Sequence, residues 1–550
     1  MMMKRFSILY ALLAMSAQGF SQTTTDDLKL QKWYLLDAEK DSTEGINLAG
    51  AYNLLQNKTA TPIVVAVIDG GIDTLHEDLK NILWINPKEK PGNGKDDDKN
   101  GYIDDVYGWN FLGNPNGENV GKASAERDRV YYGFKSKYDG KTIDTSTLTK
   151  EDKWEYIMWQ KAAAQMQINP EEQIEVMMLK AALSSLEKHN IVLKEEMQKE
   201  EFSNTDLENF NPQSARGKRS KTAFLSYLKM FDLKETVTNK LIITDLTSYT
   251  AEREQSLQSK TTAPIDYRAL IIKDDDRDLS DIHYGNPDVM GIDPEHGTHV
   301  SGIIAAQRNN QKGMEGVADH VKIMTLRCVP DGDEYDKDIA LAIRYAADNG
   351  ARVINMSFGK SFSPAKFWVD DAIRYAASKD VLIVHAAGND NKNTDTTDNF
   401  PNKYNFSTGL PAANYISVGA SSDDHLVTPG KRIAYFSNYG TKSVDIFAPG
   451  YNIYSTLPGG DKYGFNSGTS MAAPVVSGVA ALIRSYFPKL SAEQVKYAIE
   501  KSCSPLPFDT DRVNNPGGGD ASMQELCACG GFLNAKAAVA LAATLQPINK

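Results

Sequence analysis

Five short, largely apolar runs recur along this chain of 550 residues, and they constrain its fold more than any other feature. The first run, residues 63–68, reads IVVAVI and is followed by Asp69, Gly70 and Gly71. A run without polar positions that is closed by glycine is typical of a strand buried on both faces of a parallel sheet. The later runs are residues 321–326, 353–356, 381–386 and 416–420.

Helical patterns lie between these runs. Strands that alternate with helices predict an α/β fold with a mostly parallel central sheet flanked by helices. The clearest helical patterns are residues 299–307, 337–349, 365–378 and 471–486.

Residues 112–284 break this alternation. Trp154, Ile157 and Met158 have helical spacing, and Asn169-Pro170 predicts the start of a second helix. We therefore predict a mostly helical insertion, with a further helix near 222–230. The main domain would comprise residues 22–111 and 285–541, and residues 542–550 would form a tail.

The N-terminus resembles an export signal. Lys4 and Arg5 precede the apolar run 6–15, and small residues follow between Ser16 and Ser21. This order predicts a signal peptide over residues 1–21 and a secreted or periplasmic protein. No later run is apolar over 18 residues, so we expect no membrane span after signal removal.

Charge and cysteine content restrict the partners further. The formal net charge of -12 argues against a nucleic-acid-binding protein, and we expect a monomer. Cys328 ends an apolar run and is predicted to be a core thiol. Export would permit a disulfide from Cys503 to Cys527 or to Cys529, a choice that the sequence leaves open.

Two segments carry the residue types that nucleophilic hydrolysis requires. Ser470 lies in GTSMAAP before an apolar helical stretch, so its backbone N–H could bind an oxyanion at a helix N-terminus. His296 lies in HGTHVSG and is the candidate general base, whereas His299 is interpreted as a packing residue. Taken alone, Ser470 would fit a helix cap equally well.

Two further polar residues follow apolar runs. Asp69 could orient the imidazole of His296, and Asn389, in AAGND, could donate a second hydrogen bond to the oxyanion. Because sites form where parallel strands end, both positions suit catalysis. Each residue alone would also fit an ordinary turn.

Together, the segments VIDGGID, HGTHVSG, AAGND and GTSMAAP resemble the motifs of the subtilisin family, in the family's order Asp, His, Ser. The resemblance covers about residues 30–110 and 285–540. It implies a subtilisin-like fold and a serine endopeptidase with Asp69, His296 and Ser470 as catalytic triad. It also implies Asn389 as an oxyanion donor and polypeptides as substrates.

The resemblance further implies a substrate-binding strand and pocket at Ser357, Phe358 and Gly359 and at Ala387 and Gly388. The floor of this pocket would fall within residues 400–415. We expect it to accept a large apolar residue before the scissile bond.

Calcium is the cofactor that the family implies. Asp96, Asp98, Asn100 and Asp104 resemble the first half of a calcium loop, although Tyr107 stands where a closing glutamate would be. A solvated acidic turn is the alternative. Asp78 and Asn310 resemble a second family site more weakly.

Two other function classes remain alternatives. A catalytically silent binding protein with the same fold would usually lack one of the four catalytic residues, and this chain has them all. An esterase-type hydrolase would carry a Gly-x-Ser-x-Gly sequence around its nucleophile, which Ser470 lacks.

Overall fold

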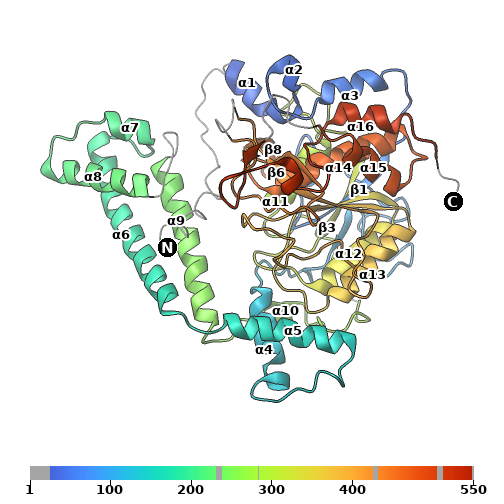
Figure 1. The fold of residues 1–550 in the computed structure, drawn as a ribbon, viewed down its shortest axis with the longest axis horizontal. Coiled ribbons are helices and arrows are strands. Elements are labelled where there is room, and N and C mark those ends of the chain that lie inside the picture. The colour runs from blue at the N-terminus through green and yellow to red at the C-terminus, as the bar shows by residue number, and fades with distance from the viewer. Residues whose placement is uncertain (1–24, 231–237, 283, 425–430, 505–511, 548–550) are drawn as a thin grey trace. The chain divides into compact units, whose positions relative to one another are not determined.

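The computed structural model describes residues 25–230, 238–282, 284–424, 431–504 and 512–547 (Figure 1). The predicted signal peptide, residues 1–21, lies outside the described residues. Within the described ranges, no helix is both long enough and apolar enough to cross a lipid bilayer. Gln160–Pro264 forms one compact unit, and the described residues before and after it form a larger one.

A seven-stranded sheet forms the centre of the larger unit, in the order β2-β3-β1-β4-β5-β6-β7. All neighbouring strands are parallel. The five apolar runs form β1 and β3 to β6, which confirms the predicted α/β fold. The two outermost strands were not predicted, because each is too short to show a pattern. The strands are β1 (Ile63–Asp69), β2 (Gly108–Asn110), β3 (Val321–Arg327), β4 (Ala351–Met356), β5 (Leu382–Ala386), β6 (Tyr415–Ser421) and β7 (Ile446–Pro449).

Helices cover both faces of this sheet (Figure 1). Ala66 and Ile68 of β1 belong to a buried cluster that includes residues of α12 (Asp336–Asp348) and α13 (Lys366–Ser378). Side chains alternate along a strand, so the equally buried Val65 and Val67 point to the opposite face. There α11 (Glu295–Ala305) and α14 (Thr469–Tyr486) contact β1 and each other.

Smaller elements complete the larger unit. The antiparallel strands β8 (Ile453–Leu457) and β9 (Lys462–Asn466) form a hairpin beside α11. The remaining elements are α1 (Thr25–Lys32), η3 (Trp33–Leu35), α2 (Ala38–Asp41), α3 (Leu48–Leu55), α4 (Glu126–Tyr138), α5 (Lys150–Gln165), α10 (Tyr267–Ile271), α15 (Ala492–Lys501), β10 (Val513–Asn514), β11 (Asp520–Ala521), η4 (Met523–Glu525) and α16 (Ala535–Ala542), where α5 runs on into the smaller unit.

The smaller unit is helical. Asn169 caps its longest helix by accepting a hydrogen bond from Glu171 N, and Pro170 occupies the first turn, where its missing N–H costs nothing. Leu186, Phe202 and Phe224 belong to its buried core. Its helices are α6 (Pro170–Met197), α7 (Asn204–Asn209), α8 (Ala215–Met230) and α9 (Asn239–Ser259).

Candidate active site

Asp69 and His296 lie 227 residues apart in the chain and touch in the structure. Asp69 is the last residue of β1 and is buried, whereas His296 lies in the first turn of α11 and its side chain is 44% exposed. His296 Nδ1 lies 2.9 Å and 3.0 Å from the two carboxylate oxygens of Asp69. This contact holds the imidazole in one orientation and leaves Nε2 free to accept a proton.

The Asp69–His296 pair shifts the titration of His296. Partial burial of the imidazole lowers its pKa, but the charge of Asp69 and the hydrogen bond to it outweigh this effect. The pKa of His296 therefore lies above its ordinary value of 6.5.

Gly297 permits this close approach of α11 to β1. A methyl group on Gly297 would lie 2.2 Å from the carbonyl oxygen of Gly71 and 3.1 Å from Asp69 Cβ. The glycine beside His296 in HGTH is thus required by packing against the strand that carries the carboxylate.

Ser470 lies in the first turn of α14, as predicted from the sequence. Its hydroxyl donates a hydrogen bond to Ser357 O at 3.0 Å, and the Ser357 hydroxyl donates one to Ser470 O at 2.9 Å. Among the described residues, no hydrogen bond joins Ser470 to His296. Catalytic hydrogen bonds often form only when substrate is bound, so this geometry is compatible with a nucleophile at rest.

Asn389 is oriented by Thr469. Its Oδ1 accepts hydrogen bonds from Thr469 N at 2.8 Å and from Thr469 Oγ1 at 2.9 Å, which turns the amide nitrogen away from Thr469. A methyl group on Gly468 would lie 3.4 Å from Asn389 Nδ2 and 3.5 Å from Ser470 N. Two nitrogen donors therefore lie near one point beside the serine, as an oxyanion site requires.

Ser357, Phe358 and Gly359 follow β4 directly. His385, buried in β5, places its Nε2 2.7 Å from Phe358 O and so holds this segment from the interior of the domain. Burial lowers the pKa of His385 to about 4, so its ring is neutral at neutral pH. Gly359 is exposed, and no described residue bonds its backbone groups, which leaves them available to a peptide.

Asn399 is a further residue at this site, which the sequence did not reveal. Its Nδ2 donates to Ala387 O at 2.9 Å. Methyl groups on Gly359 and Gly388 would lie 3.1 Å from its Oδ1 and 3.7 Å from its Nδ2. The amide thus lies between the two segments predicted to bind substrate. Nothing in the local pattern around Asn399 could have shown this.

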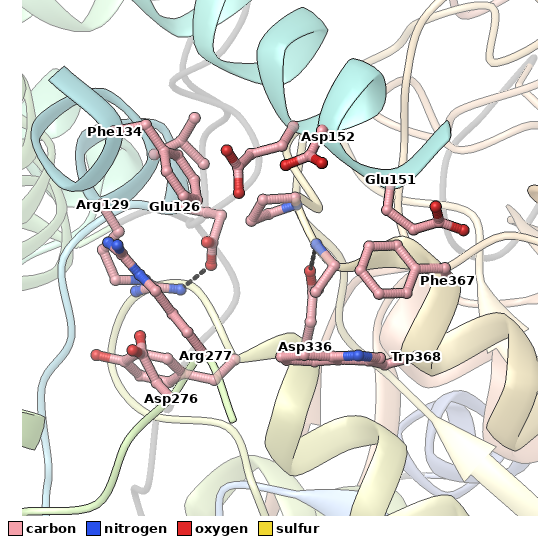
Figure 2. Close-up of a pocket in the computed structure, with 15 residues that line it drawn as sticks. Glu126, Arg129, Phe134, Glu151, Asp152, Asp276, Arg277, Asp336, Phe367 and Trp368 are labelled. Carbon is pink, nitrogen blue, oxygen red and sulfur yellow. Dashed lines mark hydrogen bonds and ion pairs between the residues drawn. The ribbon is translucent and has the colours of Figure 1, made fainter. Parts of the chain in front are cut away.

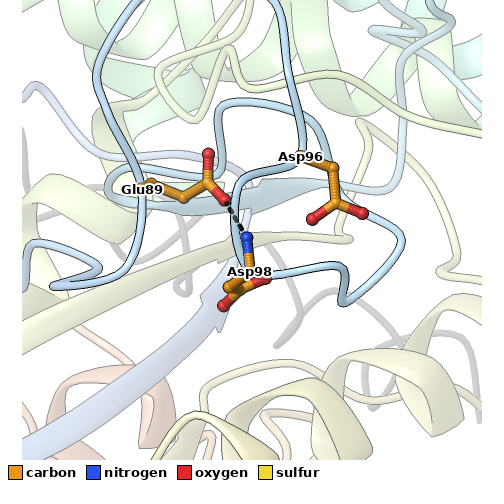
Figure 3. A group of neighbouring side chains, drawn as sticks. All are labelled: Glu89, Asp96 and Asp98. Carbon is orange, nitrogen blue, oxygen red and sulfur yellow. Dashed lines mark hydrogen bonds between the residues drawn. The ribbon is translucent and has the colours of Figure 1, made fainter.

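Three carboxylates form a candidate metal site, shown in Figure 3. Oxygens of Glu89, Asp96 and Asp98 lie within 4.8 Å of one another. Glu89, which the sequence pattern did not indicate, is 7% exposed, and its Oε2 has no hydrogen-bond partner. Asn100 Oδ1 caps Tyr102 N nearby, whereas Asp104 instead accepts hydrogen bonds from the backbone of Asn93 and Gly94.

Asp78 and Asn310 also meet. Asn310 Nδ2 donates to one carboxylate oxygen of the buried Asp78, and the Tyr463 hydroxyl donates to the other at 2.8 Å. Both oxygens of Asp78 are thus already hydrogen-bonded in this structure.

The four cysteines are free thiols here. Cys328 is fully buried, as expected of a core residue. Cys503 Sγ lies 3.0 Å from the backbone oxygen of Cys529, and Cys527 is two residues from Cys529. Both partners that the sequence allows for Cys503 are therefore in the same loop.

Several known proteins resemble this chain. A thermophilic serine proteinase of Bacillus sp. (strain AK1) is 43% identical over 228 residues, which is 40% of this chain and 51% of that protein. Subtilisin BL of Lederbergia lenta is 36% identical over 212 residues, 38% of this chain and 71% of that protein. The chain thus spans about half the length of the first relative, and 22% of the cell wall-associated protease of Bacillus subtilis (strain 168), which is 37% identical.

Among solved structures, the prenylagaramide maturation protease PagA is 31% identical, with a TM-score of 0.36 over 45% of this chain and 82% of that one. The family model described as "Subtilase family" matches residues 60–523, which include Asp69, His296, Asn389 and Ser470. This match extends over most of the chain. The protein therefore belongs to the subtilase family.

Proposed function

We propose that this protein is an exported serine endopeptidase that hydrolyses polypeptides through an acyl-enzyme. The observation that carries the proposal is the pairing of Asp69 with His296 at the end of β1. The neighbouring strand β4 ends beside it, and there Ser470 hydrogen-bonds to Ser357. A fluorophosphonate probe tests it directly, because such probes react with an activated serine. Labelling of Ser470 supports a peptidase, and absence of labelling would favour a silent binding protein.

The geometry suggests how the residues divide the chemistry. His296 accepts the proton of Ser470 once the hydroxyl turns from Ser357 O, and the serine oxygen attacks the peptide carbonyl. Asp69 stabilises the imidazolium that forms. Protonated His296 then donates its proton to the leaving amine. In the second half of the reaction, His296 accepts a proton from water, the water oxygen attacks the ester, and His296 returns the proton to Ser470.

The oxyanion would be stabilised by Asn389 Nδ2 and Ser470 N. Both donors are held before substrate arrives: Thr469 fixes the amide of Asn389, and the start of α14 leaves Ser470 N without an intrahelical partner. Donors that need not reorganise during the reaction stabilise developing charge most effectively.

The substrate would bind as a strand along Ser357–Gly359, with the side chain before the scissile bond between this segment and Ala387–Gly388. Asn399 lies at that position and narrows the pocket. We therefore propose a preference for small or polar residues there, instead of the large apolar residue that we expected from the sequence.

Replacing Asn399 with glycine should open the pocket. The ratio of kcat/KM for a phenylalanine substrate to that for an alanine substrate should rise about tenfold or more, the usual scale for a changed pocket wall. Asn405→Ala is the control, since Asn405 Oδ1 accepts from Ser407 N and Thr408 N farther along the same loop. An unchanged ratio in Asn399→Gly would show that Asn399 does not line the pocket.

We further propose that Glu89, Asp96 and Asp98 bind calcium, with Asn100 as an additional oxygen donor. Three carboxylates this close repel one another unless a cation lies between them, and the unpartnered buried Oε2 of Glu89 fits that role. Lys88 Nζ, 3.8 Å from Asp98 Oδ2, is largely exposed and neutralises the group only in part. The ion would hold the loop together and take no part in the reaction.

Calcium removal should lower the melting temperature by several degrees. A ligand at 100 times its Kd stabilises the folded state by about 2.7 kcal/mol. Glu89→Gln should lose most of this calcium effect in calorimetry, whereas Asp97→Asn should keep it, because Asp97 instead accepts from Lys90 N and Asn93. Equal melting temperatures with calcium and with a chelator in the unmodified protein would refute the site.

Export by residues 1–21, a monomeric state, and the absence of nucleic-acid partners remain part of this proposal. N-terminal sequencing of the protein recovered from periplasm and medium would test cleavage and location together. Light scattering would give the oligomeric state.

A further inference from the structure

We propose that Glu126, which lies between Asp69 and His296 in the chain, positions the substrate-binding segment Ser357–Gly359 (the substrate strand). It does so by holding the side chain of Lys360. This inference rests on the proposed peptidase function. It assigns part of the 112–284 segment a role in binding residues on the N-terminal side of the scissile bond. Glu126 would be a positioning residue, because it contacts no substrate atom.

Lys360 immediately follows Gly359, the exposed end of the substrate strand. Its Nζ lies 3.0 Å from Glu126 Oε2, 2.8 Å from Asp336 Oδ1 and 2.8 Å from Glu334 O. The side chain of Lys360 is 2% exposed, and those of Glu126 and Asp336 are 8% and 7% exposed. The ammonium group is therefore fixed in the interior by groups on three sides.

The backbone of Lys360 is held as well. Lys360 N donates to Phe400 O at 2.9 Å, and Phe400 N donates to Lys360 O at 2.8 Å. Phe400 directly follows Asn399, so this pairing joins the substrate strand to the loop that narrows the pocket. Adjacent Cα atoms are 3.8 Å apart, and any shift of Lys360 is transmitted to Gly359.

Glu126 is itself anchored to the loop before α12. Its backbone N–H donates to Asp333 Oδ2 at 2.7 Å, and its carboxylate pairs with Arg129, which donates to Glu334 O at 2.8 Å. The guanidinium of Arg129 lies over the Tyr335 ring at 4.0 Å. The first turn of α4 thus links residues 333–335 to the end of the substrate strand.

The contact of α4 with residues 333–335 and with Lys360 is confined to the first turn of the helix. Beyond Arg129, a cavity of about 250 Å³ lies between α4 and α5 on one side and residues such as Asp336 and Trp368 on the other (Figure 2). Glu126 and Arg129 lie at one wall of this cavity, and Asp336 lies at another (Figure 2). Glu126 is a residue of α4 whose side chain contacts Lys360 directly.

The charges in this cluster are balanced. Burial lowers the pKa of Lys360, but Asp336 and Glu126 outweigh it and keep the lysine charged. Burial raises the pKa of Glu126, but Arg129 and Lys360 more than offset this effect. Removing the charge of Glu126 leaves Lys360 with one carboxylate fewer, so its ammonium should move toward Asp336.

An antiparallel peptide bonds alternate residues of the strand beside it. If the residue before the scissile bond pairs with Ser357, the third residue before that bond pairs with Gly359. A displaced Gly359 should therefore weaken the binding of substrates that have a third residue before the scissile bond. Substrates with only two residues before that bond should bind as before.

The test compares Glu126→Gln with the unmodified chain on two chromogenic peptides, one with two and one with five residues before the scissile bond. Fluorophosphonate titration gives the active enzyme concentration. We expect KM for the longer peptide to rise roughly tenfold, the scale of lost backbone hydrogen bonds, with kcat nearly unchanged. The shorter peptide should show no change in either constant.

Glu155→Gln is the matched control. Glu155 lies on α5 and accepts hydrogen bonds from Lys137 at 2.7 Å and from the Tyr138 hydroxyl at 2.6 Å. It does not contact Lys360, so both peptides should be cleaved as by the unmodified chain.

A double variant separates positioning from folding. In a Lys360→Met background, Glu126→Gln should cause no further rise in KM, because the lysine on which Glu126 acts is gone. The melting temperatures of the two single variants and of the double variant show whether each is folded. An equal change for both peptides, or a lower melting temperature with an unchanged KM ratio, would overturn the proposal. Activity on the short peptide reports separately on the proposed function.

Discussion

Ser470→Ala is expected to lower kcat for a peptide substrate by about 10⁶, the magnitude found for loss of the nucleophile in subtilisin, a member of the same family. Without the hydroxyl, no acyl-enzyme can form and His296 has no proton to accept. Residual turnover would come from substrate binding and the two oxyanion donors. Steady-state hydrolysis, with fluorophosphonate labelling as a second readout, measures the effect.

The fold should survive this change. Ser470 is half-buried at a helix start, and its hydroxyl makes one hydrogen bond, to Ser357 O. The melting temperature of Ser470→Ala should therefore stay within a few degrees of the unmodified value. Ser467→Ala, three residues earlier in the chain, is a matched control, because Ser467 Oγ accepts from Asn452 N. Wild-type hydrolysis by Ser470→Ala would remove the serine from the mechanism.

Asp69→Asn should reduce kcat by about 10⁴ while leaving KM within a few fold. The neutral amide can no longer stabilise the imidazolium that forms as His296 accepts the proton. It also offers an N–H to Nδ1, which favours the wrong tautomer. Asp73→Asn is a control from the same loop, since Asp73 accepts from Gly459 N and Leu75 N and does not contact His296.

The pH profile gives an independent test of Asp69. His296 must be neutral to accept a proton, so kcat/KM should rise as pH increases through its pKa. Asp69 holds that pKa above 6.5. Removing the carboxylate charge leaves only the weaker charges of Glu295 and Asp293 to oppose burial. The pKa of His296 should therefore fall, and the acidic limb should move to lower pH in Asp69→Asn. A limb at the original pH would mean that Asp69 does not set the titration of His296.

Local features of the sequence were sufficient to predict the centre of the larger unit, namely β1, β3 to β6 and the helices α11 to α14. A run such as residues 63–68 can be buried only where both faces are covered, and this requirement predicts a parallel sheet with helices on either side. Asn169-Pro170 predicts a helix start because a side-chain cap and a proline both suit the first turn. The two outer strands lack such a signal, because β2 has only 3 residues and β7 only 4.

The residues of the candidate site also fall into two groups, those that the sequence predicted and those that only the structure revealed. Asp69, His296, Asn389 and Ser470 could be proposed from the sequence, because each lies in a short motif at a strand end or helix start. Glu89, Asn399 and Glu126 could not, since their roles depend on contacts with residues that no local pattern connects to them. Asn399 meets Gly359 and Gly388 only because β4 and β5 are neighbours in the sheet.

The sequence alone determined the family motifs, the parallel α/β core and the order of the candidate catalytic residues, since these depend on residue type and short-range spacing. Only the tertiary structure decided which carboxylates cluster, that Asn399 lies beside Gly359 and Gly388, and that Glu126 contacts Lys360. The physical reason is that hydrogen bonds and ion pairs depend on distances of about 3 Å. Such distances between remote segments are established only when the sheet and helices pack.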